Sequence, residues 1–281
     1  MFQIWCVFVG NREDGKIIVF MRFCLYFLQI SYGMGPPFRS IWINNSMRSV
    51  YILLYCTTMQ IIVYAHICQK GDWQKSFNII MDTIRTSLLY TNLCEVRIGI
   101  VNDLGVFNIE EHPLLNDPKF KIVHVGKSEE YERPTLLHMK QSAETEDPET
   151  RYFYFHTKGI KWFGTELEPF IIDWIKLMNY WNIEKWQDAF YILDKYDTYG
   201  CNFHDGTKYP KHYSGNFFWT TTHHLKTLVN EIGSDYYATE FWLCSNGLFN
   251  GSPNSYNAFT AKFAEGFGHY NYPFPESMYR K

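Results

Sequence analysis

Side chains that could bind a ligand follow directly on a run of four aromatic residues, Tyr152–Phe155. A short apolar run of strand-forming residues is typical of a buried strand that is covered on both faces. Where this strand should end, the chain continues with His156, Thr157, Lys158 and Gly159. A cation and a hydroxyl bind anions well, and a glycine lets backbone approach closely. Because ligands of open α/β sheets bind beyond the carboxyl ends of strands, the pattern predicts a site for an anionic small molecule. The alternative is a turn that carries a surface lysine.

A second polar group lies inside a later aromatic run, and it consists of His212, Tyr213, Ser214, Gly215 and Asn216. A glycine within a strand marks a bulge or the close approach of a ligand. Amide, hydroxyl and imidazole groups beside aromatic faces suit a sugar ring, whose polar edges form hydrogen bonds while its apolar face stacks. The group therefore indicates sugar binding, with a bulged core strand as the alternative.

Glu240 is a single carboxylate among the large or apolar neighbours of the segment Tyr236–Trp242. Such surroundings disfavour the charged form, so the pKa of Glu240 should rise toward that of a useful general base. The alternative is an exposed glutamate on an amphipathic helix. His204, Asp205 and His212 form a further candidate group, which would suit a metal-dependent hydrolase, although loop histidines more often bind no metal.

These residues lie in a regular alternation of elements that begins at Ile61. Strands are predicted at Ile61–Ile67, Val96–Val101, Lys121–Val125, Tyr152–Phe155, Thr198–Phe203 and His212–Thr220. Helices are predicted at Trp73–Thr91, Pro134–Met139, about Pro169–Lys195 and His223–Ile232, and the tail from Phe249 is predicted to be a loop. The alternation indicates βαβ units in one α/β domain of residues 59–281, with a mostly parallel central sheet flanked by helices.

Residues 1–58 do not share this alternation, and we expect an accessory or poorly ordered extension. The apolar segments Ile17–Ser31 and Val50–Thr58 are too short for a membrane helix, and a breaker cluster lies at Gly33–Pro37. The longer window Val50–Cys68 contains several polar residues, which argues against membrane association. A membrane-associated structural protein that uses residues 17–68 remains an alternative.

The composition narrows the class of protein. The chain has 281 residues and a net charge of −3, which argues against a nucleic-acid partner. Its seven cysteines are odd in number and include no Cys-x-x-Cys pair. This pattern favours free thiols in a reducing compartment, and hence a cytoplasmic location.

The motifs occur in a fixed order that is informative as a set. After the His-Thr-Lys-Gly tetrapeptide come Asp173-Trp174, Tyr180-Trp181, Glu184-Lys185-Trp186, Tyr196–Asn202, His212–Trp219 and Glu240–Trp242. This order resembles a group of glycosyltransferase-like proteins with a GT-A-type nucleotide-sugar fold, found in bacteria, large DNA viruses and some eukaryotes. The resemblance covers roughly residues 60–245.

The resemblance implies a hexosyltransferase, which moves a sugar from a nucleotide-diphosphate sugar donor to a hydroxyl of a glycan or other acceptor. It places Glu240 where a late acidic residue acts as the base in inverting members. It also implies a role in substrate binding for residues along the chain. These are Tyr64 and His66 beside the nucleotide, Asp103 near the base, and Asn202, His212, Ser214, Gly215 and Asn216 around the sugar and acceptor.

The chain departs from this family where the fourth strand ends. Family members carry Asp-x-Asp there, whose carboxylates hold a divalent ion such as Mn²⁺ or Mg²⁺ on the diphosphate. Here His156, Thr157, Lys158 and Gly159 stand in that place. A metal cofactor therefore does not carry over directly, and Lys158 with His156 would stabilise the diphosphate instead. A non-catalytic nucleotide- or carbohydrate-binding module on the same fold is the alternative.

Overall fold

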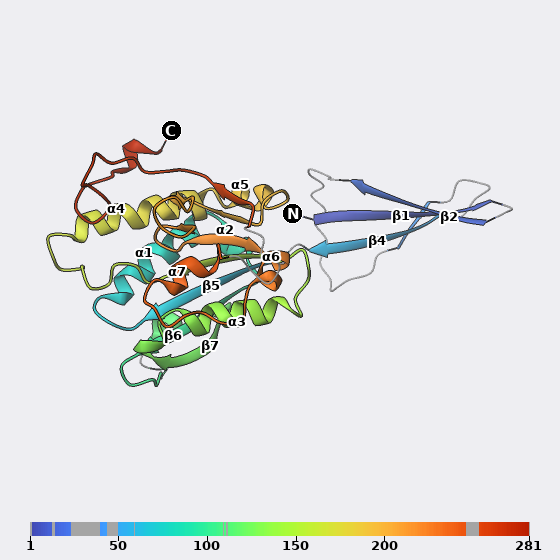
Figure 1. Cartoon of the computed structure of the whole chain (residues 1–281). Coiled ribbons are helices and arrows are strands. Elements are labelled where there is room, and N and C mark those ends of the chain that lie inside the picture. The colour runs from blue at the N-terminus through green and yellow to red at the C-terminus, as the bar shows by residue number, and fades with distance from the viewer. Residues whose placement is uncertain are drawn as a thin grey trace. The chain divides into compact units, whose positions relative to one another are not determined.

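The structure is a computed structural model that describes residues 2–12, 15–23, 40–43, 50–58, 60–108, 110, 112–245 and 253–280. The chain divides into two compact units, Met1–Met59 and Gln60–Lys281, and Figure 1 draws both. Among the described residues, no helix has both the length and the apolar character that a membrane span requires.

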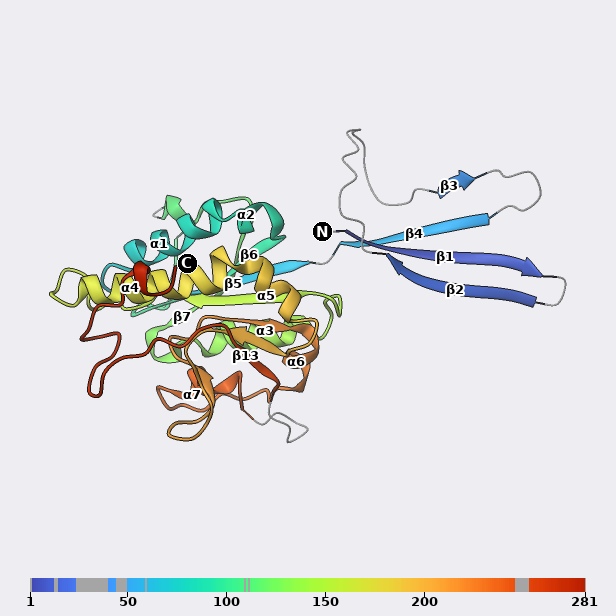
Figure 2. The same cartoon turned by 90° about the horizontal axis from the view of Figure 1, so that it is seen from above.

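The first unit contains a four-stranded antiparallel sheet in the order β2-β1-β4-β3, which Figure 2 shows from above. Its strands are β1 (Phe2–Arg12), β2 (Gly15–Phe23), β3 (Ser40–Ile43) and β4 (Val50–Thr58). β1 and β2 pair antiparallel, from Ile4 with Phe23 to Arg12 with Gly15. The sequence pattern predicts no helix or strand here, and the breaker cluster Gly33–Pro37 lies outside the described residues.

The second unit is built on a seven-stranded sheet in the order β13-β9-β12-β8-β5-β6-β7. Its strands are β5 (Ile61–Cys68), β6 (Glu95–Asn102), β7 (Phe120–Lys127), β8 (Arg151–His156), β9 (Thr198–Gly200), β12 (Phe218–Thr221) and β13 (Ser255–Asn257). All neighbours pair in parallel except those of β12, which is antiparallel to both β8 and β9. The predicted α/β class with a mostly parallel sheet is confirmed.

Helices cover both faces of this sheet. They are α1 (Trp73–Thr86), α2 (Leu89–Asn92), α3 (Arg133–Ala143), α4 (Glu168–Asn179), α5 (Trp186–Ile192), α6 (Thr222–Thr227) and α7 (Ala238–Trp242). Figure 1 shows α1 and α4 on one face and α3 on the other. A π-helical turn, Tyr180–Glu184, joins α4 to α5, and β10 (Phe203–His204) pairs with β11 (His212–Tyr213) in a small separate sheet.

The aromatic run in β8 fills the core on both sides of the sheet. Phe155 contacts Phe77 of α1, while Tyr154 belongs to a cluster with Leu136 of α3. All four residues of Tyr152–Phe155 are fully buried. Successive side chains of a strand point to opposite faces, so one continuous aromatic run supplies both layers. Burial of each such ring contributes about 1.5–3 kcal/mol to folding.

Several predicted elements differ in detail. The predicted helix Trp73–Thr91 breaks at Leu88, whose φ of 65° is left-handed, and the predicted strand His212–Thr220 is interrupted by a turn at Gly215 and Asn216. The prediction of a tail without regular structure is wrong at Ser255–Asn257, which forms β13 on the open edge of β9. A three-residue strand carries too little hydrophobic pattern to be recognised, and the pairing with β9 creates it.

Candidate functional site

The strand order reverses between β5 and β8. From β5 the chain proceeds to β6 and then β7 on one side, and after α3 it returns to β8 on the other side of β5. In open α/β sheets, ligands bind at the carboxyl ends of the strands beside such a reversal. His66 of β5 pairs with His156 of β8 at this place. The structure therefore brings these two predicted residues together.

A third histidine continues the same row across the sheet. His66 pairs with Gly99 of β6, and Gly99 pairs with His124 of β7. A Cβ on Gly99 would lie 1.9 Å from Oγ1 of Thr135, so the missing side chain makes room for this threonine. The Thr135 hydroxyl in turn lies 2.8 Å from Nδ1 of His66. The glycine thus allows α3 to fix the orientation of the His66 ring.

The environment of His66 favours its neutral form. Burial lowers the pKa of His66 to about 4, with His156 and His124 acting in the same direction and the carboxylate of Glu132 opposing them. The side chain is 3% exposed. His66 is therefore a neutral hydrogen-bonding group at neutral pH.

Glu132, which the sequence analysis missed, supplies a carboxylate beside the paired histidines. It immediately precedes α3, and its Oε2 accepts hydrogen bonds from the Tyr154 hydroxyl and the Asn216 amide, each at 2.6 Å. Its Oε1 lies 3.9 Å from Nδ1 of His156. Burial alone would raise the pKa of Glu132, but the two imidazoles and these hydrogen bonds hold it below the ordinary value. Glu132 is therefore an ionised carboxylate that orders the end of β8.

Gly215 joins His156 to Glu240. Its carbonyl accepts a hydrogen bond from Nε2 of His156 at 3.0 Å, and its N–H donates to Oε1 of Glu240 at 2.9 Å. Its φ of +95° is left-handed, and a Cβ here would lie 2.5 Å from Sδ of Met178. Only a glycine fits this turn without displacement of its neighbours. The predicted group at Gly215 and Asn216 thus contacts both other predicted groups.

Lys158 presents an unpaired ammonium at the same end of the sheet. Its Nζ lies 4.0 Å from the centre of the Trp174 ring, and it has no hydrogen-bond or ion-pair partner in the part of the chain that the structure describes. Its backbone N–H and carbonyl both bind the hydroxyl of Ser76. Burial lowers the pKa of Lys158, while the carboxylates of Glu240 and Glu132 oppose this effect. Its backbone is thus fixed while its charge is available to an anion.

Thr157 and Gly159 have structural roles on either side of Lys158. The Thr157 hydroxyl is buried and accepts a hydrogen bond from the backbone N–H of Cys68 at 3.1 Å, which ties β8 to the end of β5. Gly159 has a φ of +66°, and a Cβ there would lie 2.3 Å from Cγ2 of Ile171. The backbone therefore turns sharply against α4 directly after Lys158.

The C-terminal tail completes the surroundings of Lys158. His269 stacks on Trp174 with ring centres 4.7 Å apart, and Tyr270 meets the edge of the same ring. Asn202 reaches this group, because its Nδ2 lies 3.2 Å from Nε2 of His269. Two buried nitrogens here, Nε1 of Trp174 and Nδ1 of His269, have no hydrogen-bond partner among the described residues. The sequence offered no signal for His269 or Tyr270, since both lie in a segment with loop composition.

Other predicted residues lie away from this group. Tyr64 is fully buried in the middle of β5, where its hydroxyl accepts a hydrogen bond from Arg97 at 3.0 Å. Asp103 is exposed after β6 and pairs with Lys70 at 2.7 Å. Hydrogen bonds from Lys70 and Ser128 lower the pKa of Asp103. In the described part of the chain, neither side chain forms a hydrogen bond or an ion pair with Gly215, Glu240 or Lys158.

Two further predicted residues support the turn at Gly215. The backbone N–H of Ser214 donates to the carbonyl of Asn202 at 3.0 Å. His212 is buried, and its ring meets the ring of Phe241, the neighbour of Glu240, at 5.1 Å between centres. Both residues therefore act on the site through neighbours.

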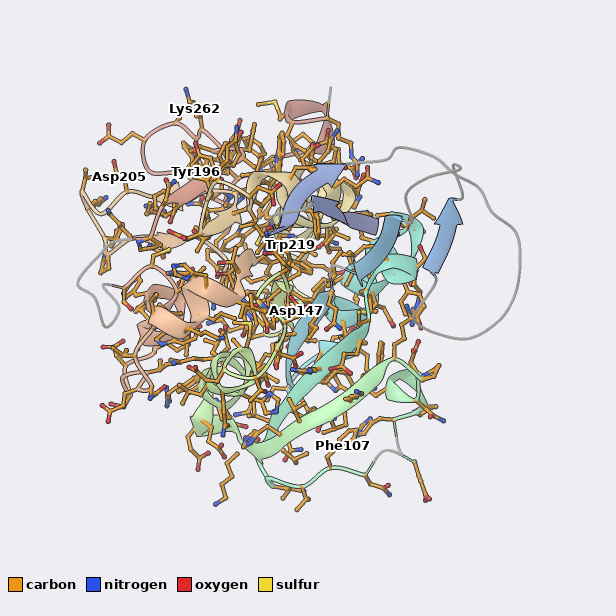
Figure 3. The ribbon with its side chains drawn as sticks, turned by 90° about the vertical axis from the view of Figure 1, so that its right-hand side faces the viewer. Phe107, Asp147, Tyr196, Asp205, Trp219 and Lys262 are labelled. Atoms are coloured by element: carbon orange, nitrogen blue, oxygen red, sulfur yellow. The ribbon has the colours of Figure 1, made fainter. Side chains whose placement is uncertain are left out.

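The candidate metal group does not assemble. His204 and His212 stack in parallel 4.4 Å apart, while Asp205 is exposed and accepts the backbone N–H of Thr207. Figure 3 shows Asp205 at the periphery, away from Trp219 in the core. Within the described ranges, no set of three or more histidine, cysteine, aspartate or glutamate side chains is placed to hold a metal ion.

Comparison of the chain with protein-family models and with curated proteins gives no match. The geometry at the ends of β5 and β8 is therefore the basis for assigning a function.

Proposed function

We propose that the protein is a glycosyltransferase with a GT-A-type fold, which moves a sugar from a nucleotide-diphosphate sugar to an acceptor hydroxyl. The observation that carries the proposal is a cation and a carboxylate brought to one strand end. Lys158 provides the unpaired ammonium, and Glu240 provides the carboxylate. The sheet order supports the same function, because the group lies beside the reversal between β5 and β8 where nucleotides bind in related topologies.

The donor end of the proposed site contains Lys158 and His156. When the bond between the sugar and the diphosphate breaks, negative charge develops on the departing diphosphate. A positioned cation at that place stabilises the transition state more than the ground state. Lys158 suits this role because its backbone is held by Ser76 while its ammonium is unpaired. His156 would add a second, oriented imidazole beside it.

The acceptor end contains Glu240. One carboxylate oxygen, Oε1, is held by the N–H of Gly215, and the other has no hydrogen-bond partner among the residues described. A base that is anchored through one oxygen can accept a proton through the other. In the proposed step, Glu240 takes the proton of the acceptor hydroxyl, the acceptor oxygen bonds to the sugar carbon, and the diphosphate leaves with the bonding electrons.

The donor set does not fit a divalent metal ion. Magnesium and manganese prefer carboxylate and carbonyl oxygens. At the end of β8 the Thr157 hydroxyl is buried against Cys68, and Lys158 carries a positive charge. The carboxylate oxygen Oε2 of Glu132 already accepts two hydrogen bonds, one from Tyr154 and one from Asn216. The proposed mechanism therefore contains no step through a metal.

A non-catalytic nucleotide- or carbohydrate-binding module is the second candidate, and the replacement of Asp-x-Asp by His156, Thr157 and Lys158 favours it. The two functions share the binding groups and differ only in whether bonds break. They therefore require an experiment that separates binding from turnover.

A thermal-shift screen of nucleotide-sugars on the full chain tests the binding step. A ligand at 100 times its Kd stabilises the native state by about 2.7 kcal/mol and raises Tm. The donor that binds is then assayed for release of nucleoside diphosphate and for transfer, with and without Mn²⁺. Transfer supports the transferase, and binding without turnover supports the module. Failure to bind any nucleotide or nucleotide-sugar would contradict the transferase and a nucleotide-binding module, and would leave only a carbohydrate-binding module.

A further inference from the structure

Four exposed tyrosines lie in the chain segments that carry Glu132, Glu240 and His269. They are Tyr131, Tyr236, Tyr237 and Tyr270, and between 40% and 62% of each side chain is exposed. We call this set the tyrosine cluster. Large aromatic side chains gathered at a surface mark binding sites more often than scattered ones do. The cluster has no role in the core and thus needs another explanation.

The rings of the tyrosine cluster form an ordered surface. Tyr236 meets Tyr131 edge-on at 5.5 Å and meets Tyr237 at 5.0 Å, while Tyr237 stacks on Phe241 at 6.1 Å. Tyr270 packs edge-on against Trp174 at 5.0 Å. These contacts fix the rings in place before any ligand arrives.

Three separate chain segments supply the cluster, and the same segments supply the site. Tyr131 precedes Glu132, and Tyr236 and Tyr237 precede α7, which carries Glu240. Tyr270 follows His269 in the C-terminal tail. Each segment that contributes a tyrosine to the cluster thus also contributes a residue to the site, and this links the cluster to the proposed catalytic group.

A backbone hydrogen bond places Tyr237 one turn before Glu240, because the N–H of Glu240 donates to the carbonyl of Tyr237 at 3.1 Å. Burial, followed by the charge of Glu240, raises the pKa of Tyr270 to about 12. Burial also raises the pKa of Tyr236, with smaller contributions from Tyr270, Glu132 and Glu240. Both hydroxyls are therefore neutral and able to donate a hydrogen bond at neutral pH.

The chemistry of the cluster matches a carbohydrate better than other ligands. A tyrosine offers an apolar ring face together with a hydroxyl, and a sugar offers an apolar C–H face together with hydroxyls at its edge. A nucleobase would also stack, but it has no alcohol to present to Glu240. An aliphatic chain would gain little from neighbouring carboxylates and phenol groups.

We propose that the tyrosine cluster binds the acceptor, and that the acceptor is a carbohydrate whose ring lies on Tyr236 and Tyr237 with one hydroxyl directed at Glu240. This inference rests on the proposed transferase function, and it adds the substrate class. Tyr131 and Tyr270 flank the ring on either side, where they contact neighbouring sugar units of a longer chain.

A printed array of plant, animal and microbial glycans, probed with the intact chain, tests the inference without requiring a donor. The best-bound oligosaccharide is then titrated into the wild type and into the double variant Tyr236→Ala/Tyr237→Ala. We expect at least a tenfold loss of affinity in the double variant. Tyr191→Ala, at a tyrosine of α5 that is 42% exposed, is the matched control and should bind normally. Tyr236→Phe/Tyr237→Phe keeps the rings and should retain most of the affinity.

The outcomes separate the inference from the function on which it rests. Absence of binding to any glycan, or unchanged affinity in a double variant that melts normally, would overturn the inference even if nucleotide-sugars are turned over. Glycan binding that depends on the two tyrosines, without turnover of any donor, would keep the sugar site and refute the transferase. If transfer is observed, the double variant should raise the KM for the acceptor and leave the KM for the donor unchanged.

Discussion

Glu240 and His156 hold opposite ends of the same residue. The N–H of Gly215 donates to Glu240 at 2.9 Å, and its carbonyl accepts from His156 at 3.0 Å. The proposed base and the proposed leaving-group imidazole come from elements that are 84 positions apart in the sequence. One backbone turn therefore sets their relative position, and a change in this turn must displace both.

Gly215→Ala should damage the site and the fold together. The positive φ makes an alanine unfavourable by about 1–2 kcal/mol, and the contacts of the new Cβ with Met178 and Trp174 add about 1–3 kcal/mol. Urea unfolding measures the loss. Gly164→Ala is the control, because Gly164 also has a positive φ but nothing lies within 4 Å of its Cβ position. Equal losses in both variants would contradict the close packing at Gly215.

Glu240→Gln should lower the rate of transfer by about 100- to 10,000-fold, the usual contribution of a general base. The amide oxygen of glutamine can still accept the N–H of Gly215, so the turn should survive. Donor affinity, measured by calorimetry, should remain within about threefold, since the base contributes chiefly to the transition state. Turnover comparable to that of the wild type would refute the role of Glu240.

Lys158→Ala should weaken the binding of a nucleoside diphosphate by about 10- to 100-fold, as expected for the loss of a charged hydrogen bond worth about 1.5–3 kcal/mol. Lys161→Ala is the matched control, because its ammonium also lies over an indole, that of Trp162, but is exposed. Calorimetry with the nucleoside diphosphate measures both variants. Equal affinity in the wild type and Lys158→Ala would remove Lys158 from the proposed phosphate site.

His66 should make the protein less stable as the pH falls from about 6.5 toward about 4. Below pH 6.5 the unfolded chain binds a proton at this residue, whereas the folded chain does not until the pH nears 4, so the free energy of unfolding decreases. The full effect is about 3 kcal/mol, since a tenfold change in proton affinity is worth about 1.4 kcal/mol.

Urea unfolding at several pH values tests this dependence against the variant His66→Asn, whose amide can still bind the hydroxyl of Thr135. The pH dependence of the variant should be shallower between pH 6.5 and 5. Glu132, whose pKa is lowered, adds its own loss only at more acidic pH. Identical slopes for the two proteins above pH 5 would show that His66 is protonated equally in both states.

The sequence predicted the strands that build the site more reliably than it predicted the partners of the site. The aromatic run Tyr152–Phe155 identified β8 because each residue is a strong strand former that suits a sheet covered on both faces. The end of that strand then located His156 and Lys158. Such a pattern is local in sequence, and it predicts the structure well where neighbouring residues decide the conformation.

Glu132 could not be found in the same way. Its neighbours Tyr131 and Arg133 are typical of an exposed helix start, and its carboxylate is ordered by Tyr154 and Asn216 from distant strands. Tyr64 is predicted from its strand to lie beside the nucleotide. It lies in the first strand of the sheet, four residues before the strand ends, and its buried side chain has its hydroxyl hydrogen-bonded to α3 and Arg97.

The stacking of His269 on Trp174 has a consequence for biosynthesis. Chains emerge from the ribosome with the N-terminal residues first, and domains begin to fold as they emerge. The sheet from β5 to β12 and the helices that cover it are encoded before residue 243, so this part can begin to assemble before His269 has emerged. Trp174, over which the Lys158 ammonium lies, then lacks the rings of His269 and Tyr270 until the tail docks. Ligand binding at Lys158 would thus have to wait until residues 269 and 270 have been synthesised.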